Sequence, residues 1–322
     1  MEFDLIARIR ARAAARADVV LGIGDDCALL QPPPGTQLAV TADTLNAGVH
    51  FAQGSAPGDI GWKALAVNLS DLAAMGAAPA WCLLSLSLPA ADEAWVDGFL
   101  DGFLALARAH GVALVGGDTT RGPLSIGVTA HGLLAPGRAL RRSGASEGDD
   151  VWVSGQLGDA AAALALVPGG KEGASPPPAA VVAGIRARLD RPEPRVALGR
   201  GLVGVATACI DLSDGLLADL GHVAAASGVA ARISVDALPA SPALVALELD
   251  HGLRRTLQAT GGDDYELCFT APPRRREAVA AAAAEVGVPV TRIGSIHAGS
   301  GVQAVDLAGA SWAPPRAGYV HF

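Results

Sequence analysis

Aspartates that stand beside glycines or small residues recur along this chain of 322 residues, in six short segments. The segments are Gly24–Asp26, Thr41–Asp43, Asn68–Asp71, Gly116–Asp118, Asp211–Gly215 and Gly261–Asp264. Mg²⁺ takes oxygen ligands in near-octahedral geometry and usually shares them with substrate phosphates. Carboxylates beside flexible backbone suit a hard cation and a polyphosphate. The segments together therefore favour a Mg²⁺-dependent, nucleotide-using enzyme.

The strongest local signal is the stretch Gly116–Gly122, which follows the apolar residues Val112–Val115. A glycine pair after a strand lets backbone N–H groups approach phosphate oxygens, and the next aspartate can hold a metal that bridges those phosphates. The stretch Asp211–Gly215 has two interpretations, an ordinary helix N-cap or part of an anion site at the helix N-terminus. Any one of the six segments alone is typical of a simple turn.

Asp71 is harder to explain as a surface residue, because the helix expected around it is otherwise apolar. A buried ionised carboxylate needs a partner, and Lys63 is the lysine nearby. Asn68 lies three residues before Asp71, so both side chains are expected on one helix face. His50 follows Asp43 closely enough to face the same cleft, although a lone histidine is more often an ordinary core or surface residue.

The composition excludes some classes of protein. Hydrophobic residues make up 51% of the chain, enough for one large or two ordinary domains. The formal net charge is −8 without a basic run, which argues against nucleic-acid binding. The chain shows neither a signal-peptide core nor an apolar stretch of about 18 residues, so we expect a soluble, cytoplasmic protein with no membrane partner. Buried, reduced thiols are expected for Cys27, Cys82, Cys209 and Cys268. The sequence has no GxxxxGK[ST] loop and no kinase HRD and DFG pair.

Strands and helices alternate along the first half of the chain. A strand is predicted over 38–43, with Thr41 and Asp43 on one face and Val40 and Ala42 on the other. The other elements expected in this half are helices over 2–17, 58–75 and 92–110 and strands over 112–115 and 124–134. The helix over 92–110 is expected to begin after Asp92 as N-cap and to end at Gly111.

The pattern breaks at Ala135–Gly137, where we expect a domain boundary. Residues 168–179 are rich in Pro, Gly, Ser and Ala and predict a surface loop. The remaining elements expected are a strand over 150–154, an alanine-rich helix after Gly158, helices near 214–227 and 276–286, and strands near 265–270 and 289–296. Alternation in both halves indicates α/β or α+β domains.

Several blocks, in order and over almost the whole chain from Gly22 to Tyr319, resemble the thiamine-monophosphate kinases. The most specific blocks are Trp62–Ala77, Gly116–Pro123, Ile210–Asp219 and Tyr265–Thr270. The resemblance implies ATP-dependent phosphorylation of thiamine monophosphate to thiamine diphosphate. It also implies an α/β (α+β), two-domain PurM-like fold, shared with aminoimidazole-ribonucleotide synthetase and selenophosphate synthetase.

In that fold an N-terminal α/β domain, expected over residues 1–137, binds ATP and Mg²⁺ and pairs across a homodimer to form a barrel. A C-terminal α/β domain, expected over residues 138–322, covers the nucleotide and substrate site. The implied partners are therefore ATP, thiamine monophosphate and a second copy of the chain, with several Mg²⁺ ions as cofactors.

The resemblance carries over, position by position, to three kinds of site residue. The implied Mg²⁺ ligands are Asp26, Thr41, the backbone of Ala42, Asp43, Asp71, Asp118, Asp211 and Asp214. The implied ATP contacts are Gly117, Asp118, Arg142 and Ser213, and the implied substrate contacts are His50, Asp263 and Tyr319. Of these, the residues expected to act in catalysis are Asp43, Asp118 and Arg142.

Two positions depart from the family pattern. Ala42 stands where a hydroxyl residue is usual, so any ligation there must come from the backbone. Asp263 stands where a glutamate is usual, and the loss of one methylene either weakens substrate orientation or admits a bridging water.

The implied chemistry is direct in-line transfer of the γ-phosphoryl group to a phosphate oxygen of thiamine monophosphate. Aspartate-held Mg²⁺ would neutralise the two anionic reactants and fix their geometry. The acceptor phosphate is already ionised near neutral pH, because its second pKa is about 6, so no general base is required. The alternatives are a sister synthetase of the same superfamily and a non-catalytic Mg²⁺/nucleotide-binding module.

Overall fold

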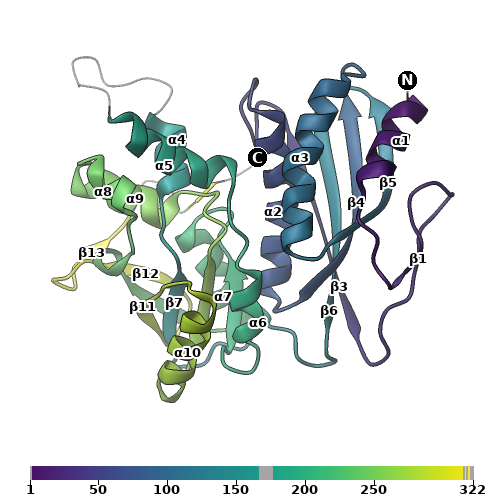
Figure 1. The fold of residues 1–322 in the computed structure, drawn as a ribbon. Helices are drawn as coiled ribbons and strands as arrows, with labels where there is room; N and C mark the ends of the chain where they lie inside the picture. Colours follow the sequence, from purple (N-terminus) through teal and green to yellow (C-terminus); the bar gives the residue numbers. More distant parts are fainter. Residues whose placement is uncertain (1, 167–176, 315, 317, 320–322) are drawn as a thin grey trace. The chain divides into compact units, whose positions relative to one another are not determined.

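The computed structural model describes residues 2–166, 177–314, 316, 318 and 319. The chain divides into two compact units (Figure 1). Unit 1 comprises Met1–Leu72 and Ala77–Ala139, and unit 2 comprises Ala73–Gly76 and Leu140–Phe322. Both units combine helices with a β-sheet, which confirms the predicted α/β (α+β) class.

Unit 1 is built on a four-stranded sheet with the strand order β3-β6-β4-β5. The strands are β3 (Gln37–Asn46), β6 (Ser125–Leu134), β4 (Ala78–Leu88) and β5 (Ala113–Arg121). All neighbours are antiparallel except β4 and β5, which are parallel. Figure 1 shows α2 (Pro57–Ala74) and α3 (Glu93–Ala109) side by side over one face of this sheet, with α1 (Glu2–Arg12) beside α3.

Glycines allow α2 and α3 to pack closely. A Cβ on Gly102 would lie 1.7 Å from the Gly58 carbonyl oxygen, and one on Gly61 would lie 2.0 Å from the Phe99 carbonyl oxygen. Any side chain at either position would force the helices apart. The predicted start of α3 is confirmed, because the Asp92 carboxylate accepts a hydrogen bond from the Trp95 N–H at 3.0 Å.

The opposite face of the unit 1 sheet is only partly covered. A short antiparallel pair, β1 (Val19–Leu21) and β2 (Leu29–Leu30), places Val19 and Leu30 against the buried Trp81 and Val115. On β3 the predicted alternation is confirmed, since Thr41 and Asp43 are half-buried while Val40 and Ala42 are exposed. The side chain of Val40 is 59% exposed, which is unusual for a valine in the middle of a ten-residue strand.

Unit 2 is built on a seven-stranded sheet with the strand order β13-β12-β9-β11-β7-β10-β8. Its strands are β7 (Asp150–Ser154), β8 (Ala208–Asp211), β9 (Ala230–Ser234), β10 (Leu267–Ala271), β11 (Val290–His297), β12 (Gly301–Val305) and β13 (Ser311–Trp312). Neighbouring strands are antiparallel except β9 and β12.

The helices of unit 2 form two groups. The helix α7 (Leu216–Ser227) packs on the sheet through residues such as Leu220 and Val223. A second apolar cluster joins α4 (Asp159–Leu166), α5 (Ala179–Asp190), α8 (Pro242–Ala246) and α9 (His251–Thr260). The short α6 (Val196–Gly201) and the helix α10 (Arg276–Val286) complete the unit, with the 3-10 turns η1 (Val235–Ala237) and η2 (Pro273–Arg275).

Three expectations need correction. The helix predicted over 2–17 ends at Arg12, because Arg16 and Trp81 both donate to the Asp18 carboxylate and fix the turn into β1. The strand predicted over 112–115 continues to Arg121, because the glycine pair and Asp118 still pair with β4. Cys27 is exposed, whereas the other three cysteines are buried as expected.

The predicted loop 168–179 falls mostly on residues 168–176, which lie outside the described part of the chain. Among the described residues, no helix combines the length and the apolar character needed to cross a membrane.

Candidate functional site

The first group of expected site residues lies where β3 faces α2 in unit 1. The Thr41 hydroxyl donates a hydrogen bond to the Asp71 carboxylate. The Asn68 side-chain oxygen accepts from the Asp43 N–H at 3.1 Å. Asn68 and Asp71 therefore point toward the same strand, as their spacing on the helix predicted. Alternation along β3 brings Asp43 onto the same face as Thr41.

Electrostatics in this group suit a cation. Burial, with a contribution from the negative charge of Asp71, raises the pKa of Asp43 to about 6. Two half-buried carboxylates and a hydroxyl form an all-oxygen donor set, which is the kind that Mg²⁺ prefers. A bound cation would offset both the burial and the repulsion from Asp71 that raise this pKa. The residues present therefore fit Mg²⁺.

The second group surrounds a cavity of about 1050 Å³ in unit 1. The lining brings Gly24–Cys27 together with Gly116–Thr119, and Arg10 of α1 also contributes. Asp26, Gly117 and Asp118 thus face one space although about 90 residues separate them in the chain. This volume is at the upper end of small-molecule sites, which usually measure roughly 300–1,000 Å³.

Backbone geometry explains the glycines of this group. Gly117 has φ +145°, and a Cβ there would lie 1.8 Å from the Leu84 carbonyl oxygen of the neighbouring strand. The next residue, Asp118, is exposed and accepts a hydrogen bond from the Thr119 N–H at 2.9 Å. Asp118 stands opposite Ser85, also exposed, in the β4–β5 register. The carboxylate therefore lies at the open face of the sheet.

Unit 1 thus holds two acidic groups: Thr41, Asp43 and Asp71 lie between β3 and α2, and Asp26 and Asp118 line the cavity. Nowhere in the described residues do three or more Asp, Glu, His or Cys side chains converge closely enough to hold an ion by themselves. Mg²⁺ in nucleotide sites commonly takes only one or two carboxylates and fills its shell with phosphates and water.

The third group lies in unit 2, where two aspartate-rich loops run side by side. The Ser213 carbonyl accepts from the Asp263 N–H at 2.9 Å, and the Leu212 carbonyl accepts from the Tyr265 N–H at 2.8 Å. The Tyr319 N–H donates to the Asp214 carbonyl at 2.9 Å. These backbone bonds gather four of the expected residues, Ser213, Asp214, Asp263 and Tyr319, at one place. Asp211, at the end of β8, is buried beside them.

Asp219, on the first turn of α7, shapes the loop before that helix. One carboxylate oxygen accepts three backbone N–H groups, from Ser213, Asp214 and Gly215, at 3.0–3.1 Å. Burial raises the pKa of Asp219 to about 6, although the three hydrogen bonds act in the opposite direction. Sequence reasoning missed this role; the signal available was an acid placed in the first turn of an apolar helix.

The remaining expected residues are His50 and Arg142. His50 follows β3, and its Nδ1 accepts from the Asn46 N–H at 3.0 Å. Lys63, considered above as a partner of Asp71, is buried and donates to the His50 carbonyl at 3.2 Å. Arg142, at the start of unit 2, is exposed.

Comparisons with known proteins match both halves of the chain. Residues 24–134 match the family of AIR synthase related proteins, N-terminal domain, and residues 146–306 match the corresponding C-terminal domain. The thiamine-monophosphate kinase of Salmonella typhimurium is 49% identical over 298 residues, which cover 92% of this chain and 90% of that protein.

Two solved structures share the fold over almost the full length. The crystal structure of thiamine-monophosphate kinase from Stenotrophomonas maltophilia has 57% identity and a TM-score of 0.87, and the match covers 94% of this chain and 96% of that one. The structure of AaThiL complexed with AMPPCP and TMP has 33% identity and a TM-score of 0.78, covering 99% and 96%. The chain therefore belongs to the thiamine-monophosphate kinase family of AIR synthase related proteins.

Proposed function

We propose that this protein transfers the γ-phosphoryl group of ATP to thiamine monophosphate, forming thiamine diphosphate and ADP. The observation that carries the proposal is the full-length match to AaThiL complexed with AMPPCP and TMP. AMPPCP is an ATP analogue, so that relative binds both a nucleotide and TMP. At the positions that the resemblance assigns to such ligands, the present chain matches the family pattern apart from Ala42 and Asp263.

Three acidic groups would hold Mg²⁺ in this proposal. Thr41, Asp43 and Asp71, with the backbone of Ala42, form one set, and Asp26 and Asp118 form another. Asp211 and Asp214 supply carboxylates from unit 2. Bound Mg²⁺ would supply charge neutralisation for the two phosphate groups that must meet.

The protein's own residues bind and orient the reactants. The Gly117 backbone can approach the nucleotide phosphates closely because no side chain blocks it, and Ser213 offers a hydroxyl to the nucleotide. Arg142, as an exposed guanidinium, is suited to paired hydrogen bonds with phosphate oxygens. His50, Asp263 and Tyr319 are assigned to thiamine monophosphate.

The transfer needs no proton acceptor. A new P–O bond forms between the acceptor phosphate oxygen and the γ-phosphorus, while the bond from the γ-phosphorus to the β–γ bridging oxygen breaks. ADP leaves with the electron pair of that bond. The acceptor oxygen carries no proton near neutral pH, because the second pKa of a phosphate monoester is about 6. Positioning and charge stabilisation are then the whole task of the site.

We also propose that residues 1–137 form the nucleotide-binding and dimerisation domain and residues 138–322 the domain that covers the substrates. The apolar side chains on the open face of β3 support a homodimer. Leu38 is 46% exposed and Val40 is 59% exposed, on a strand that a second copy could cover. We propose a cytoplasmic location, where ATP is available.

A panel of phosphate acceptors tests the proposal. The pure protein is incubated with ATP and Mg²⁺ and, in separate reactions, with thiamine monophosphate, free thiamine, a pyrimidine phosphate or a thiazole phosphate. We expect products only in the reaction that contains thiamine monophosphate. That reaction should form ADP and thiamine diphosphate in equal amounts. ATP binding without ADP release would indicate a binding module, and ADP formation with none of the thiamine compounds phosphorylated would indicate a sister synthetase.

A further inference from the structure

A short segment of unit 2 holds two residues other than glycine in the left-handed region of the backbone map. Asp263 has φ +67° and Tyr265 has φ +49°. Such conformations are strained for residues with side chains and persist only where the surroundings impose them. The Tyr265 hydroxyl donates to the Asp263 carboxylate at 3.0 Å, and both side chains are half-buried. The strained segment thus presents a carboxylate and a phenol as a pair.

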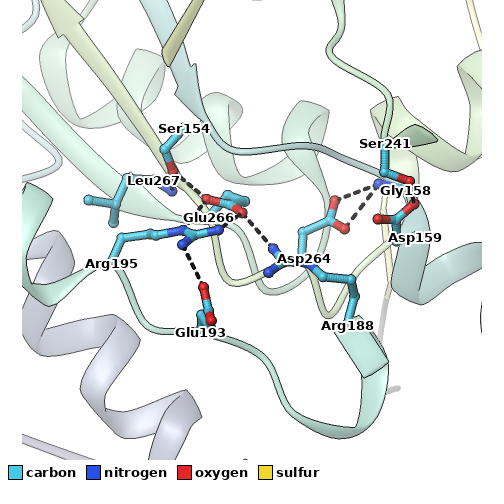
Figure 2. Close-up of polar contacts among 10 residues, drawn as sticks. All are labelled: Ser154, Gly158, Asp159, Arg188, Glu193, Arg195, Ser241, Asp264, Glu266 and Leu267. Atoms are coloured by element: carbon cyan, nitrogen blue, oxygen red, sulfur yellow. Dashed lines mark hydrogen bonds and ion pairs between the residues drawn. The ribbon is translucent and has the colours of Figure 1, made fainter. Parts of the chain in front are cut away.

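The next residue inward, Glu266, is completely buried and held by two arginines (Figure 2). Arg195, just before α6, donates through Nε and Nη2 to the two carboxylate oxygens at 2.7 and 2.6 Å. Arg188, on α5, donates to Oε1 at 2.6 Å. Ser154, at the end of β7, donates its hydroxyl to Oε2 at 2.6 Å and accepts from the Leu267 N–H at 2.8 Å. Glu266 is therefore fixed from three separate elements.

Asp264 anchors the other side of the strained segment. Its carboxylate is buried and accepts from the Gly158 N–H at 3.0 and 3.1 Å (Figure 2). Gly155 has no room for a side chain, since a Cβ there would lie 2.0–2.6 Å from the Glu266 carboxylate. Asp264 and Glu266 thus point into the unit, and the alternating residues Asp263 and Tyr265 are forced to the more open side.

We infer that Glu266, held between Arg188 and Arg195, is a positioning residue for thiamine monophosphate. The ion-paired cluster holds the segment 262–265 in its strained form, so that Asp263 and Tyr265 present a fixed, negatively charged contact. This inference rests on the proposed function, in which Asp263 contacts the substrate.

The chemistry of the substrate fits such a contact. Thiamine carries a permanent positive charge on its thiazolium ring and hydrogen-bond donors on its aminopyrimidine. A carboxylate that is already fixed by a neighbouring hydroxyl gives up little conformational freedom on binding, so affinity gains from preorganisation. ATP lacks a comparable cationic group. The cluster should therefore affect thiamine monophosphate and ATP unequally.

The test is Arg195→Lys, which retains the positive charge but loses the paired donors of the guanidinium. We expect the KM for thiamine monophosphate to rise about tenfold or more, because small misplacements of positioning groups have effects of this order. The KM for ATP should rise much less, because the ATP contact Ser213 meets this segment only through its backbone carbonyl, which accepts from the Asp263 N–H. Calorimetry of thiamine monophosphate binding in the presence of AMPPCP should show the same loss of affinity.

Arg276→Lys is the matched control. Arg276 donates through Nε and Nη2 to both oxygens of the buried Asp150 at 2.6 and 2.8 Å, at the opposite end of β7 from Ser154. This control removes a similar pair of guanidinium hydrogen bonds in the same unit, and it should leave both KM values unchanged. If Arg195→Lys fails to fold, Ser154→Ala removes one hydrogen bond to Glu266 and should raise the KM for thiamine monophosphate more than the KM for ATP.

Each outcome decides the question. A folded, active Arg195→Lys protein with an unchanged KM for thiamine monophosphate overturns the inference, as does an equal rise in both KM values. If Ser154→Ala has to be used, an unchanged KM for thiamine monophosphate overturns it too. A wild-type protein that forms no thiamine diphosphate refutes the proposed function and, with it, this inference.

Discussion

Replacing Asp43 by asparagine should stabilise the metal-free protein at neutral pH. Burial and the charge of Asp71 raise the pKa of Asp43 to about 6, from the ordinary value of 3.8. A group whose pKa is raised in the folded state contributes stability below its unfolded pKa and loses that contribution as the pH rises through the folded pKa. The shift of about two pKa units corresponds to about 3 kcal/mol lost between pH 4 and pH 7.

Asparagine has no such charge to bury, and the hydrogen bond from the Asp43 N–H to Asn68 is unaffected because it uses the backbone. In metal-free buffer at pH 7.5 we expect the free energy of unfolding of Asp43→Asn to exceed that of wild type by up to about 3 kcal/mol. Its Tm should be higher by about 5–10 °C. At pH 4 the two proteins should be equally stable. Mg²⁺ should stabilise wild type at pH 7.5 and the variant much less, because the cation replaces the missing counter-charge.

Urea and thermal unfolding in EDTA at pH 4, 6 and 7.5, repeated at pH 7.5 with Mg²⁺, measure these differences. Asp118→Asn is the control, since Asp118 is exposed and its hydrogen bond from the Thr119 N–H survives the substitution. Its stability in EDTA should stay within about 0.5 kcal/mol of wild type. A destabilised Asp43→Asn protein at pH 7.5, or one that Mg²⁺ stabilises as strongly as wild type, would refute the reasoning.

Three further predictions concern the loops and the open sheet face. Asp219→Ala leaves three backbone N–H groups in the loop before α7 without their acceptor, so we expect urea unfolding to show a loss of about 1–3 kcal/mol; unchanged stability would contradict the role of this carboxylate. Gly117→Ala places a Cβ 1.8 Å from the Leu84 carbonyl at φ +145°, and the same assay should show a loss of about 2–4 kcal/mol, whereas a neutral effect would mean that the strand tolerates a side chain there. Val40→Asp puts a charge on the open face of β3 and should give a monomer of 32.2 kDa by light scattering where wild type gives twice that mass; equal masses would count against this face as the dimer interface.

Local patterns in the sequence correctly predicted which site residues share one face of a strand or helix. Alternation along β3 predicted that Thr41 and Asp43 share a face, and helical spacing predicted the same for Asn68 and Asp71. Both rules depend only on residues within a few positions of one another. They succeed because the strand and the helix are regular where these residues stand.

Long-range pairing could not be predicted in the same way. Glu266 meets Arg188 and Arg195 across 78 and 71 residues, and nothing in the local sequence of any of the three indicates the ion pair. The continuation of β5 through its glycines depends on β4, which supplies hydrogen-bond partners along the whole strand. Cys27 precedes the apolar residues Ala28 and Leu29 but directly follows Asp25 and Asp26 on an exposed segment, so the prediction that its thiol is buried was wrong.

Our central claim is that aspartates of this chain hold the Mg²⁺ ions that neutralise the reacting phosphates during phosphoryl transfer to thiamine monophosphate. Its most direct test is the turnover rate for thiamine diphosphate formation by wild type, Asp43→Asn and Asp118→Asn at saturating ATP, Mg²⁺ and thiamine monophosphate. We expect each substitution to lower kcat about 100-fold or more while circular dichroism shows an intact fold. Near-wild-type turnover by both variants would contradict it.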